Sequence, residues 1–256
     1  MKTLPPPITK SQKKIILFLL KFRFTTTSQQ QKYFNHKDPK RIKEWLKDLR
    51  KKRYIYAIVE DHDITKPYIY CLASGSRHIL KENKDVSKSF LNRIYKEKNL
   101  TKIFKEHCLF LVDTYLFFLS QKDKKSKMAF CTSQDLDSFD YLPKDLDAYI
   151  AVETNGVTKR YFLELFDEYK DKTGIIRYSV RKYLTYFQDG SWQANTENSP
   201  SPSIFFVMAN ERRRAFVSHY GKAKLAKTFE DISLYLTTQD LIRFGNGKVN
   251  IWKKVV

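Results

Sequence analysis

The chain has 256 residues, of which 42% are hydrophobic and 15% aromatic, and it carries 48 Lys and Arg residues against 28 Asp and Glu residues. This length suits one large domain or two ordinary ones with packed cores, and the apolar content argues against a disordered chain. The formal net charge of +20 indicates a polyanionic partner, either nucleic acid or an anionic membrane surface.

Missing motifs disfavour several classes of protein. The apolar runs are shorter than the ~18 residues of a membrane span, and the first residues do not resemble a signal peptide, so we expect a cytoplasmic protein. Cys71, Cys108 and Cys131 are odd in number and widely spaced, which suits reduced thiols rather than disulfides or a CxxC zinc site. The histidines form no HExxH pair, and the glycines form neither a GxxxxGK nor a GxGxxG loop.

The first 75 residues are the most basic region, with 17 Lys and Arg residues against 6 Asp and Glu residues. Apolar residues over 11–24 predict a buried core helix. A second helix is expected from Thr27, because Thr27 and Gln30 have the spacing of a capping box. The best-defined helix is the third, with Asp38 as N-cap and Pro39 at the first helical position. Its apolar stripe is Ile42, Trp45, Leu46 and Leu49.

The face of this third helix opposite the apolar stripe is predicted to be basic and exposed. Lysine contacts phosphates without reading bases, so we expect DNA binding that weakens as salt rises. The alternative is a solvated helix face, in which Glu44 and Asp48 pair with neighbouring basic residues. The DNA-binding candidates on this face and its flanks are Lys40, Arg41, Lys43, Lys47, Arg50 and Lys51.

Two β-rich runs, 53–59 and 67–72, follow the third helix and predict a hairpin through the polar residues 60–66. Three helices followed by a hairpin are the elements of a winged helix-turn-helix, whose third helix enters the major groove of DNA. We therefore predict a winged helix-turn-helix domain over residues 1–80. A basic connecting segment is expected over 81–105, and a second domain over 106–256.

The second domain is predicted to be α/β with a mixed sheet. A buried helix is expected over 106–121, and a further, amphipathic helix over 175–187. The strand, helix, strand run from 160 to 209 is long enough for a right-handed parallel crossover. The strands are expected at 128–132, 147–153, 160–166 and 203–209, with Asn155-Gly156 as the turn between the second and third.

Glu164 lies inside a strand whose two faces are both apolar. It shares one face with Phe162 and Phe166, so its ionised carboxylate needs a cation or strong donors. Asp147 begins the preceding strand, and two carboxylates so placed suit a divalent metal held against a phosphodiester. A nearby lysine would stabilise the charge that develops on phosphorus. A structural ion pair is the alternative role for Glu164.

Taken together, these features resemble the replication-relaxation family of plasmid and mobile-element proteins, which includes MobC-type relaxases. The resemblance covers most of the chain and depends on the order and spacing of its motifs. They are FRFTTTSQQQKYF at 22–34, the RIKEWLKDLRKKRYI segment at 41–55, Asp147-Ala148, Phe162-Leu163-Glu164, Lys182 to Tyr186, and Arg212 to Arg214 as a basic turn.

The resemblance implies a winged helix followed by a restriction-endonuclease-like domain of the PD-(D/E)xK kind, and therefore an α+β or α/β fold. It implies that the protein nicks or relaxes DNA at a replication or transfer origin, with Mg²⁺ or Mn²⁺ bound by Asp147 and Glu164 and with Lys182 as catalytic lysine. Phe166 stands where the nuclease motif favours lysine. A non-catalytic accessory or regulator that binds DNA is therefore the alternative.

Among partners, double-stranded DNA is expected and a membrane is not. The lysines lie on a pattern of three helices and a hairpin rather than on one long amphipathic helix, which disfavours binding to a membrane surface. A homodimer and contacts with mobilisation or replication proteins are left open. On helix geometry alone, Lys182 projects away from the apolar stripe of its helix, as a solvent-facing lysine would.

Overall fold

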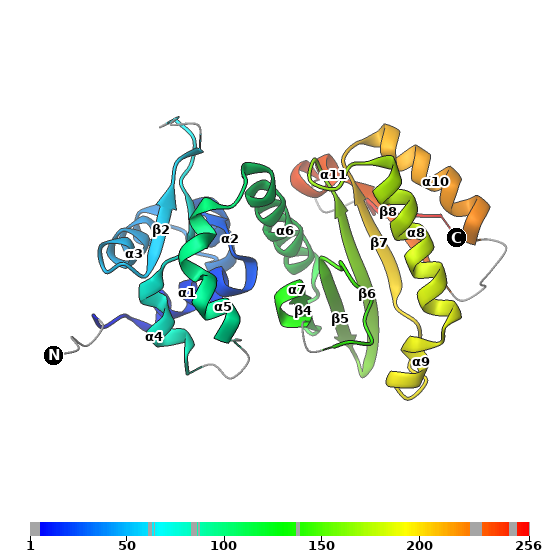
Figure 1. Ribbon diagram of the computed structural model, residues 1–256, viewed down its shortest axis with the longest axis horizontal. Helices are drawn as coiled ribbons and strands as arrows, with labels where there is room; N and C mark the ends of the chain where they lie inside the picture. The colour runs from blue at the N-terminus through cyan, green and yellow to red at the C-terminus, as the bar shows by residue number, and fades with distance from the viewer. Residues whose placement is uncertain are drawn as a thin grey trace. The chain divides into compact units, whose positions relative to one another are not determined.

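The computed structural model divides into two compact units, Met1–Val112 and Asp113–Val256, and has a mixed α+β fold (Figure 1). The boundary falls inside helix α6 (Lys102–Gln121), and residues 81–105 belong to the first unit. None of the described helices combines the length with the apolar content of a membrane span. The described residues are 6–60, 63, 65–82, 86, 88–136, 139–225, 232–245 and 250–255.

Three helices open the first unit: α1 (Lys10–Phe22), α2 (Thr27–Phe34) and α3 (Pro39–Lys51). The capping box of α2 is formed by Thr26 and Gln29, one residue earlier than predicted, because Thr26 is the last residue with an extended backbone. The predicted start of α3 is confirmed. Asp38 is the N-cap, and its carboxylate accepts a hydrogen bond from the Lys40 N–H at 2.8 Å.

The predicted hairpin is confirmed as strands β2 (Ile55–Ile58) and β3 (Ile69–Leu72), which pair antiparallel. Residues 61, 62 and 64 of its expected turn lie outside the described residues. A strand that was not predicted, β1 (Thr25–Thr26), pairs with the other edge of β3, so the sheet order is β1-β3-β2. Two residues are too few to give a strand pattern in the sequence.

Short helices complete the first unit and cover its core. They bring Leu80, Leu91 and Ile94 against apolar residues of α1 and α3, among them Leu19 and Leu46. Part of the basic segment predicted to connect the domains is therefore packed into the first core. These helices are the 3-10 helix η2 (Ser74–Ser76), α4 (Arg77–Leu80), α5 (Lys88–Arg93) and the 3-10 helix η3 (Ile94–Asn99).

The second unit is built on a six-stranded mixed sheet of order β4-β5-β6-β7-β8-β9. The first three strands are antiparallel, the β6, β7 and β8 strands are parallel, and β9 is antiparallel to β8. The hairpin through Asn155 and Gly156 is confirmed, and both residues have the positive φ that such a turn requires. The strands are β4 (Lys127–Thr132), β5 (Ala148–Thr154), β6 (Val157–Phe166), β7 (Ser203–Met208), β8 (Leu234–Thr238) and β9 (Lys253–Lys254).

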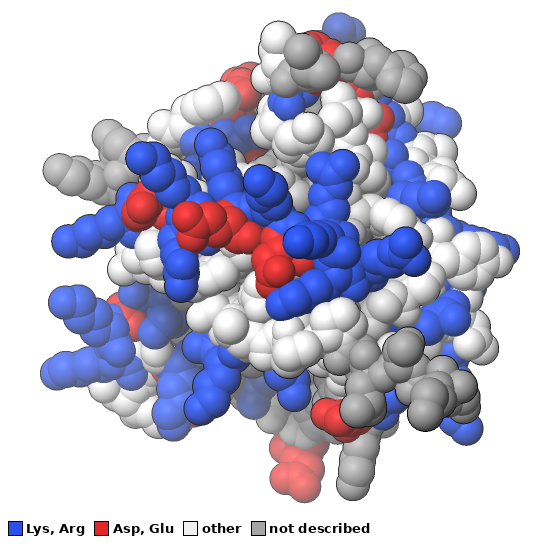
Figure 2. Space-filling model, turned by 90° about the vertical axis from the view of Figure 1, so that its left-hand side faces the viewer, with Lys and Arg blue, Asp and Glu red and all other residues white. Residues whose placement is uncertain are grey.

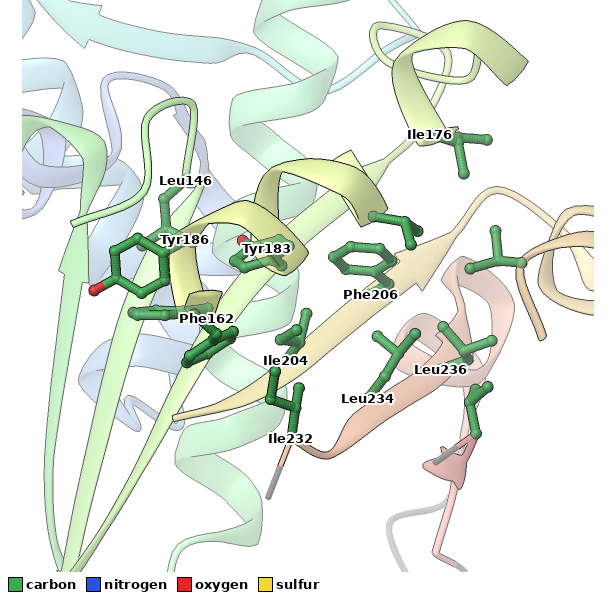
Figure 3. Close-up of a cluster of buried hydrophobic side chains, with 14 of the residues drawn as sticks. Leu146, Phe162, Ile176, Tyr183, Tyr186, Ile204, Phe206, Ile232, Leu234 and Leu236 are labelled. Carbon is green, nitrogen blue, oxygen red and sulfur yellow. The ribbon is translucent and has the colours of Figure 1, made fainter. Parts of the chain in front are cut away.

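Helices α8 (Thr173–Gln188) and α10 (Glu211–Leu225) cover one face of this sheet (Figure 1). Phe162 and Phe206 of the sheet pack there against Ile176 and Tyr183 of α8 (Figure 3). On the other face, the Phe118 ring of α6 stacks on Phe205 at a centroid distance of 6.0 Å. The consecutive residues 162–166 of β6 are all buried, so this strand is covered on both sides, as its composition predicts.

The remaining helices of the second unit are short: α7 (Ser133–Leu136), α9 (Ser191–Asn195) and α11 (Gln239–Phe244). The expectation of a basic turn after β7 is wrong. The arginines at 212–214, expected as a basic turn, lie in the first turn of helix α10. Asn210 begins that turn, since its side-chain oxygen accepts a hydrogen bond from the Arg213 N–H at 3.0 Å.

Candidate functional site

Asp147 is held at the end of the β5–β6 ladder by hydrogen bonds to the neighbouring strand. Its backbone N–H donates to the Leu163 carbonyl at 3.1 Å, and its Oδ2 accepts from the Leu165 N–H at 2.7 Å. The residue lies immediately before β5 and is buried. The carboxylate is therefore fixed by the backbone of the strand that also carries Glu164.

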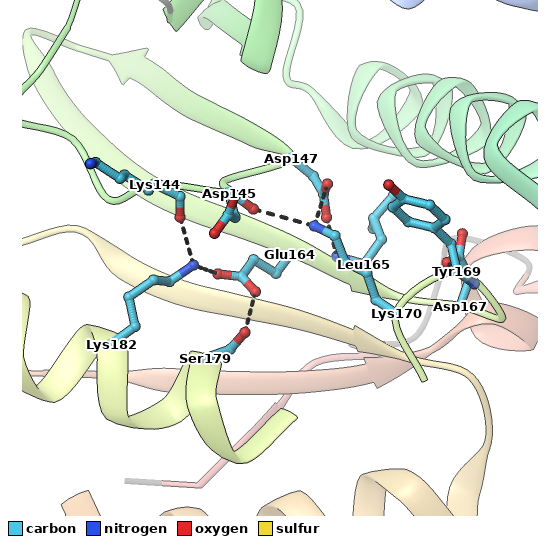
Figure 4. Close-up of polar contacts among 10 residues, drawn as sticks. All are labelled: Lys144, Asp145, Asp147, Glu164, Leu165, Asp167, Tyr169, Lys170, Ser179 and Lys182. Atoms are coloured by element: carbon cyan, nitrogen blue, oxygen red, sulfur yellow. Dashed lines mark hydrogen bonds and ion pairs between the residues drawn. The ribbon is translucent and has the colours of Figure 1, made fainter. Parts of the chain in front are cut away.

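Glu164 lies within β6, in register with Phe206 of the parallel strand β7, and is only 1% exposed. Its Oε1 accepts a hydrogen bond from the Lys182 Nζ, and its Oε2 accepts one from the Ser179 hydroxyl at 2.8 Å (Figure 4). The cation that its buried position demands is thus provided by the protein, as an ion pair with Lys182.

Lys182 lies inside the site, so the solvent-facing position that helix geometry alone suggested is wrong. Its side chain is 10% exposed, and its Nζ also donates to the Lys144 carbonyl at 2.8 Å. Ser179 and Lys182 are three residues apart and therefore lie on the same side of α8. Because α8 crosses the face of the sheet that bears Glu164, this side meets the carboxylate. The sequence fixes the spacing of the two residues but not the strand that faces them.

Lys170, in the turn that follows β6, is a member of the cluster that the sequence did not suggest. Its Nζ donates to Asp147 Oδ1 at 2.8 Å and to the Asp145 carbonyl at 3.2 Å (Figure 4). Burial lowers the pKa of this lysine, but attraction from Asp147 and Glu164 outweighs the burial and raises the pKa above its ordinary value. Both carboxylates therefore act on one cation. The run DEYKDK around Lys170 reads as an ordinary solvated turn and gave no signal.

The interior beside Glu164 is shielded from solvent. The side chain of Tyr183, the next residue after Lys182, is fully buried. Burial, and after it the charge of Glu164, raises the pKa of the Tyr183 hydroxyl well above its ordinary value. Electrostatic interactions in such surroundings are stronger than at a solvated surface, so the ion pairs of the cluster hold their positions firmly.

The donor set of this cluster fits a magnesium ion in part. Mg²⁺ commonly takes one or two carboxylates and completes its shell with water and substrate phosphate, and Asp147 and Glu164 provide two. Within the described residues, no group of three or more Asp, Glu, His or Cys side chains is placed to hold a metal. Lys170 already contacts one oxygen of Asp147, and Lys182 contacts one oxygen of Glu164. A bound cation would have to displace both ammonium groups.

The predicted DNA-binding residues all lie on α3 and are all exposed. Figure 2 shows the side of the molecule on which this helix lies, where many Lys and Arg side chains surround a smaller acidic group. Arg41 pairs with Glu44 at 3.1 Å, and Lys52 pairs with Asp48 at 2.7 Å. Both acids of the helix are thus already paired, and Asp48 also accepts a hydrogen bond from the Gln12 side chain of α1 at 2.7 Å. Over the described part of the chain, no carboxylate pairs with Lys40, Lys43, Lys47 or Lys51.

No protein-family model and no curated protein matches this chain. Among solved structures, that of the restriction endonuclease FokI is similar over 93% of this chain, with 10% sequence identity and a TM-score of 0.35. The chain spans 44% of that endonuclease. Similarity at this level is too low to assign a fold or an activity.

Proposed function

We propose that the chain binds double-stranded DNA through its first unit and cleaves one strand in its second, as a nickase dependent on Mg²⁺ or Mn²⁺. The observation that supports the proposal is the convergence of Asp147, Glu164 and Lys182, which come from three separate elements, into one cluster (Figure 4). Buried, coupled charges of this kind are more common at functional sites than elsewhere. In line with the resemblance of the sequence, the substrate is DNA of a plasmid or other mobile element.

In this proposal, Asp147 and Glu164 would hold the ion, and the ion would supply Lewis acidity toward a phosphodiester. The Leu165 N–H orients Asp147, and the Ser179 hydroxyl orients Glu164. Lys182 provides positive charge beside the scissile phosphate and offsets the negative charge that develops there. It replaces the lysine that the motif would place two residues after Glu164, where this chain has Phe166.

The first unit selects and holds the DNA. Its three helices and hairpin have the order of a winged helix-turn-helix, which would place α3 in the major groove. The exposed lysines of α3 would release counterions from the phosphates on binding, so affinity falls steeply with salt. Lysine contacts to phosphate position a protein but do not specify a sequence.

A second function is favoured by the ion pairs themselves. Lys170 and Lys182 neutralise both carboxylates, so the cluster is stable without a metal and serves as a structural polar core. The protein would then be a non-catalytic DNA-binding accessory or regulator. Phe166 at the motif position of the lysine supports this alternative as well.

Supercoiled plasmid separates the two functions. The full chain is incubated with plasmid and Mg²⁺ or Mn²⁺, and formation of open circle is compared with that of Glu164→Gln, which keeps the shape of the side chain. Nicking that requires the metal and is lost in the variant supports the nickase, provided that the variant still binds DNA. Salt-sensitive binding without nicking would contradict cleavage and leave the accessory function.

A further inference from the structure

A second basic feature of the first unit lies beyond the exposed face of α3. An open cleft of about 620 Å³ is bounded by the end of α3, strand β2 and the turn after β3. Its cationic lining comes from Arg50, Lys52 and Arg53, and none of its described lining residues is acidic. Its volume lies within the range of ligand-binding sites.

Arg53 adopts a backbone conformation that ordinarily favours glycine. Its φ is 62°, and it directly follows the last turn of α3. The Arg53 N–H donates to the Arg50 carbonyl and the Tyr54 N–H to the Leu49 carbonyl, each at 3.0 Å. Helices that end with this pair of hydrogen bonds usually have glycine at the position of Arg53, because a Cβ is disfavoured there. An arginine at this position suggests that its side chain has a use.

Arg23 provides an internal comparison, because it also has a positive φ, of 66°, and also ends a helix. Its guanidinium binds Glu97 through two hydrogen bonds, at 2.9 and 2.7 Å, and lies over the Phe104 ring. Those contacts account for an arginine at a strained position. Arg53 is exposed. Among the described residues, no carboxylate pairs with its guanidinium and no aromatic ring lies against it.

The backbone around Arg53 is tightly held, so the cleft is a formed feature of the fold. A Cβ at Gly75 would overlap the Arg53 carbonyl oxygen, which means that the turn after β3 packs directly on this residue. The Ala73 N–H also donates to the Tyr54 carbonyl at 2.9 Å. Of the other cations, Lys52 is engaged by Asp48 and by the Pro7 carbonyl, which leaves Arg50 and Arg53 for a ligand.

We infer that this cleft binds a phosphate of the DNA backbone, with Arg53 as its main contact and Arg50 joining it to the basic face of α3. Arginine presents a fork of donors that matches phosphate geometry. The inference rests on the proposed DNA binding by the first unit and adds an anchor at the base of the hairpin. A free nucleotide offers the same phosphate chemistry, so the test must separate the two sources.

The test uses Arg53→Asn in the full chain, because asparagine tolerates a positive φ and the variant should fold at least as stably. Binding to a labelled DNA duplex of mixed sequence is measured over a range of salt concentrations. We expect affinity at low salt to fall about three- to tenfold and the salt slope to fall by about 1, the effect of removing a single phosphate-binding group. Lys14→Gln, on the exposed side of α1, should change affinity less than about twofold.

Two further measurements decide between the outcomes. Lys47→Gln, on α3, tests the proposed function separately: if it weakens DNA binding and Arg53→Asn does not, the cleft inference is overturned and the proposed function stands. If the wild type does not bind DNA, both fail. Titration with AMP tests the other source of phosphate. AMP binding that is lost in Arg53→Asn, with unchanged duplex affinity, would make the cleft a small-nucleotide site and overturn the inference.

Discussion

The two units use lysine in opposite ways. On α3 the side chains of Lys43, Lys47 and Lys51 extend into solvent and pair with no described carboxylate. In the second unit, Lys170 and Lys182 are largely buried, and each is bound to a carboxylate of the sheet. The same residue type therefore provides exposed positive charge in one place and buried, paired charge in the other.

The difference shows what the surroundings do to a charge. Water and salt screen an exposed ammonium, so it contributes little to stability but can attract a polyanion. A buried ammonium has lost its hydration, so its carboxylate partner becomes necessary to the fold. Substitutions on α3 should therefore change binding, whereas substitutions in the cluster should first change stability.

Glu164→Ala is expected to have the largest effect. It leaves the Lys182 ammonium buried without its carboxylate, and breaking such a pair costs about 3–5 kcal/mol in the free energy of unfolding. Urea denaturation of the full chain measures the loss. The double variant Glu164→Leu with Lys182→Met should recover most of it, because an apolar pair has no charge to satisfy. A loss below about 1 kcal/mol in the single variant would show that the pair is not needed for folding.

Removing the exposed lysines should give the reverse result. We expect the triple change to Gln on α3 to lower DNA affinity at least about tenfold, or about 1.4 kcal/mol, and to reduce the salt slope by about 0.9 for each phosphate that is no longer neutralised. The free energy of unfolding should stay within about 0.5 kcal/mol of wild type. The triple variant carries Lys43→Gln, Lys47→Gln and Lys51→Gln, and its matched control carries Lys10→Gln, Lys13→Gln and Lys14→Gln on the exposed side of α1.

Equal losses of affinity in the triple variant and in its control would mean that total charge, rather than the α3 face, governs binding. Fluorescence anisotropy with a labelled duplex measures both proteins under the same conditions. Circular dichroism of each variant checks that helix content is retained.

Asp38→Ala tests the N-cap that stabilises the first turn of α3. The Asp38 carboxylate caps the first turn of α3, and loss of an N-cap costs about 1 kcal/mol. Thermal or urea unfolding should show this loss, while DNA affinity should not fall, because the change removes a negative charge and no positive one. Asp38→Ser, which can still cap the helix, should lie close to wild type. An equal loss in both variants would rule out capping as the cause.

The smallest effect concerns alkaline pH. The pKa of Lys170 is raised in the folded protein above its ordinary value of 10.5, so its contribution to stability is complete below pH 10.5 and is lost as pH rises through the folded pKa. The free energy of unfolding should therefore fall more steeply above pH 10.5 in wild type than in Lys170→Met. Parallel urea titrations at pH 9 and pH 11 make the comparison. Identical slopes would contradict the role assigned to Lys170.

Local signals in the sequence predicted the first three helices, the hairpin, α6, α8 and strands β4 to β7, but not the other elements, among them α10, β8 and β9. The Asp38-Pro39 start of α3 and the Asn155-Gly156 turn were predicted correctly, because capping and turn preferences depend on a few adjacent residues. The parallel pairing of β6 with β7 followed from the length of the crossover between them. Strand β1 was missed, since its two residues are extended only because they pair with β3.

The sequence by itself determined that Glu164 would be buried and would need a positive partner, because a strand alternates its side chains and both faces of this one are apolar. Only the tertiary structure decided which cations lie beside the buried carboxylates. Lys182 comes from a helix and Lys170 from a turn that holds Asp147, and a helix pattern gives the direction of a side chain but not what lies in that direction. The partners of a buried charge are set by the packing of distant segments, which no local pattern encodes.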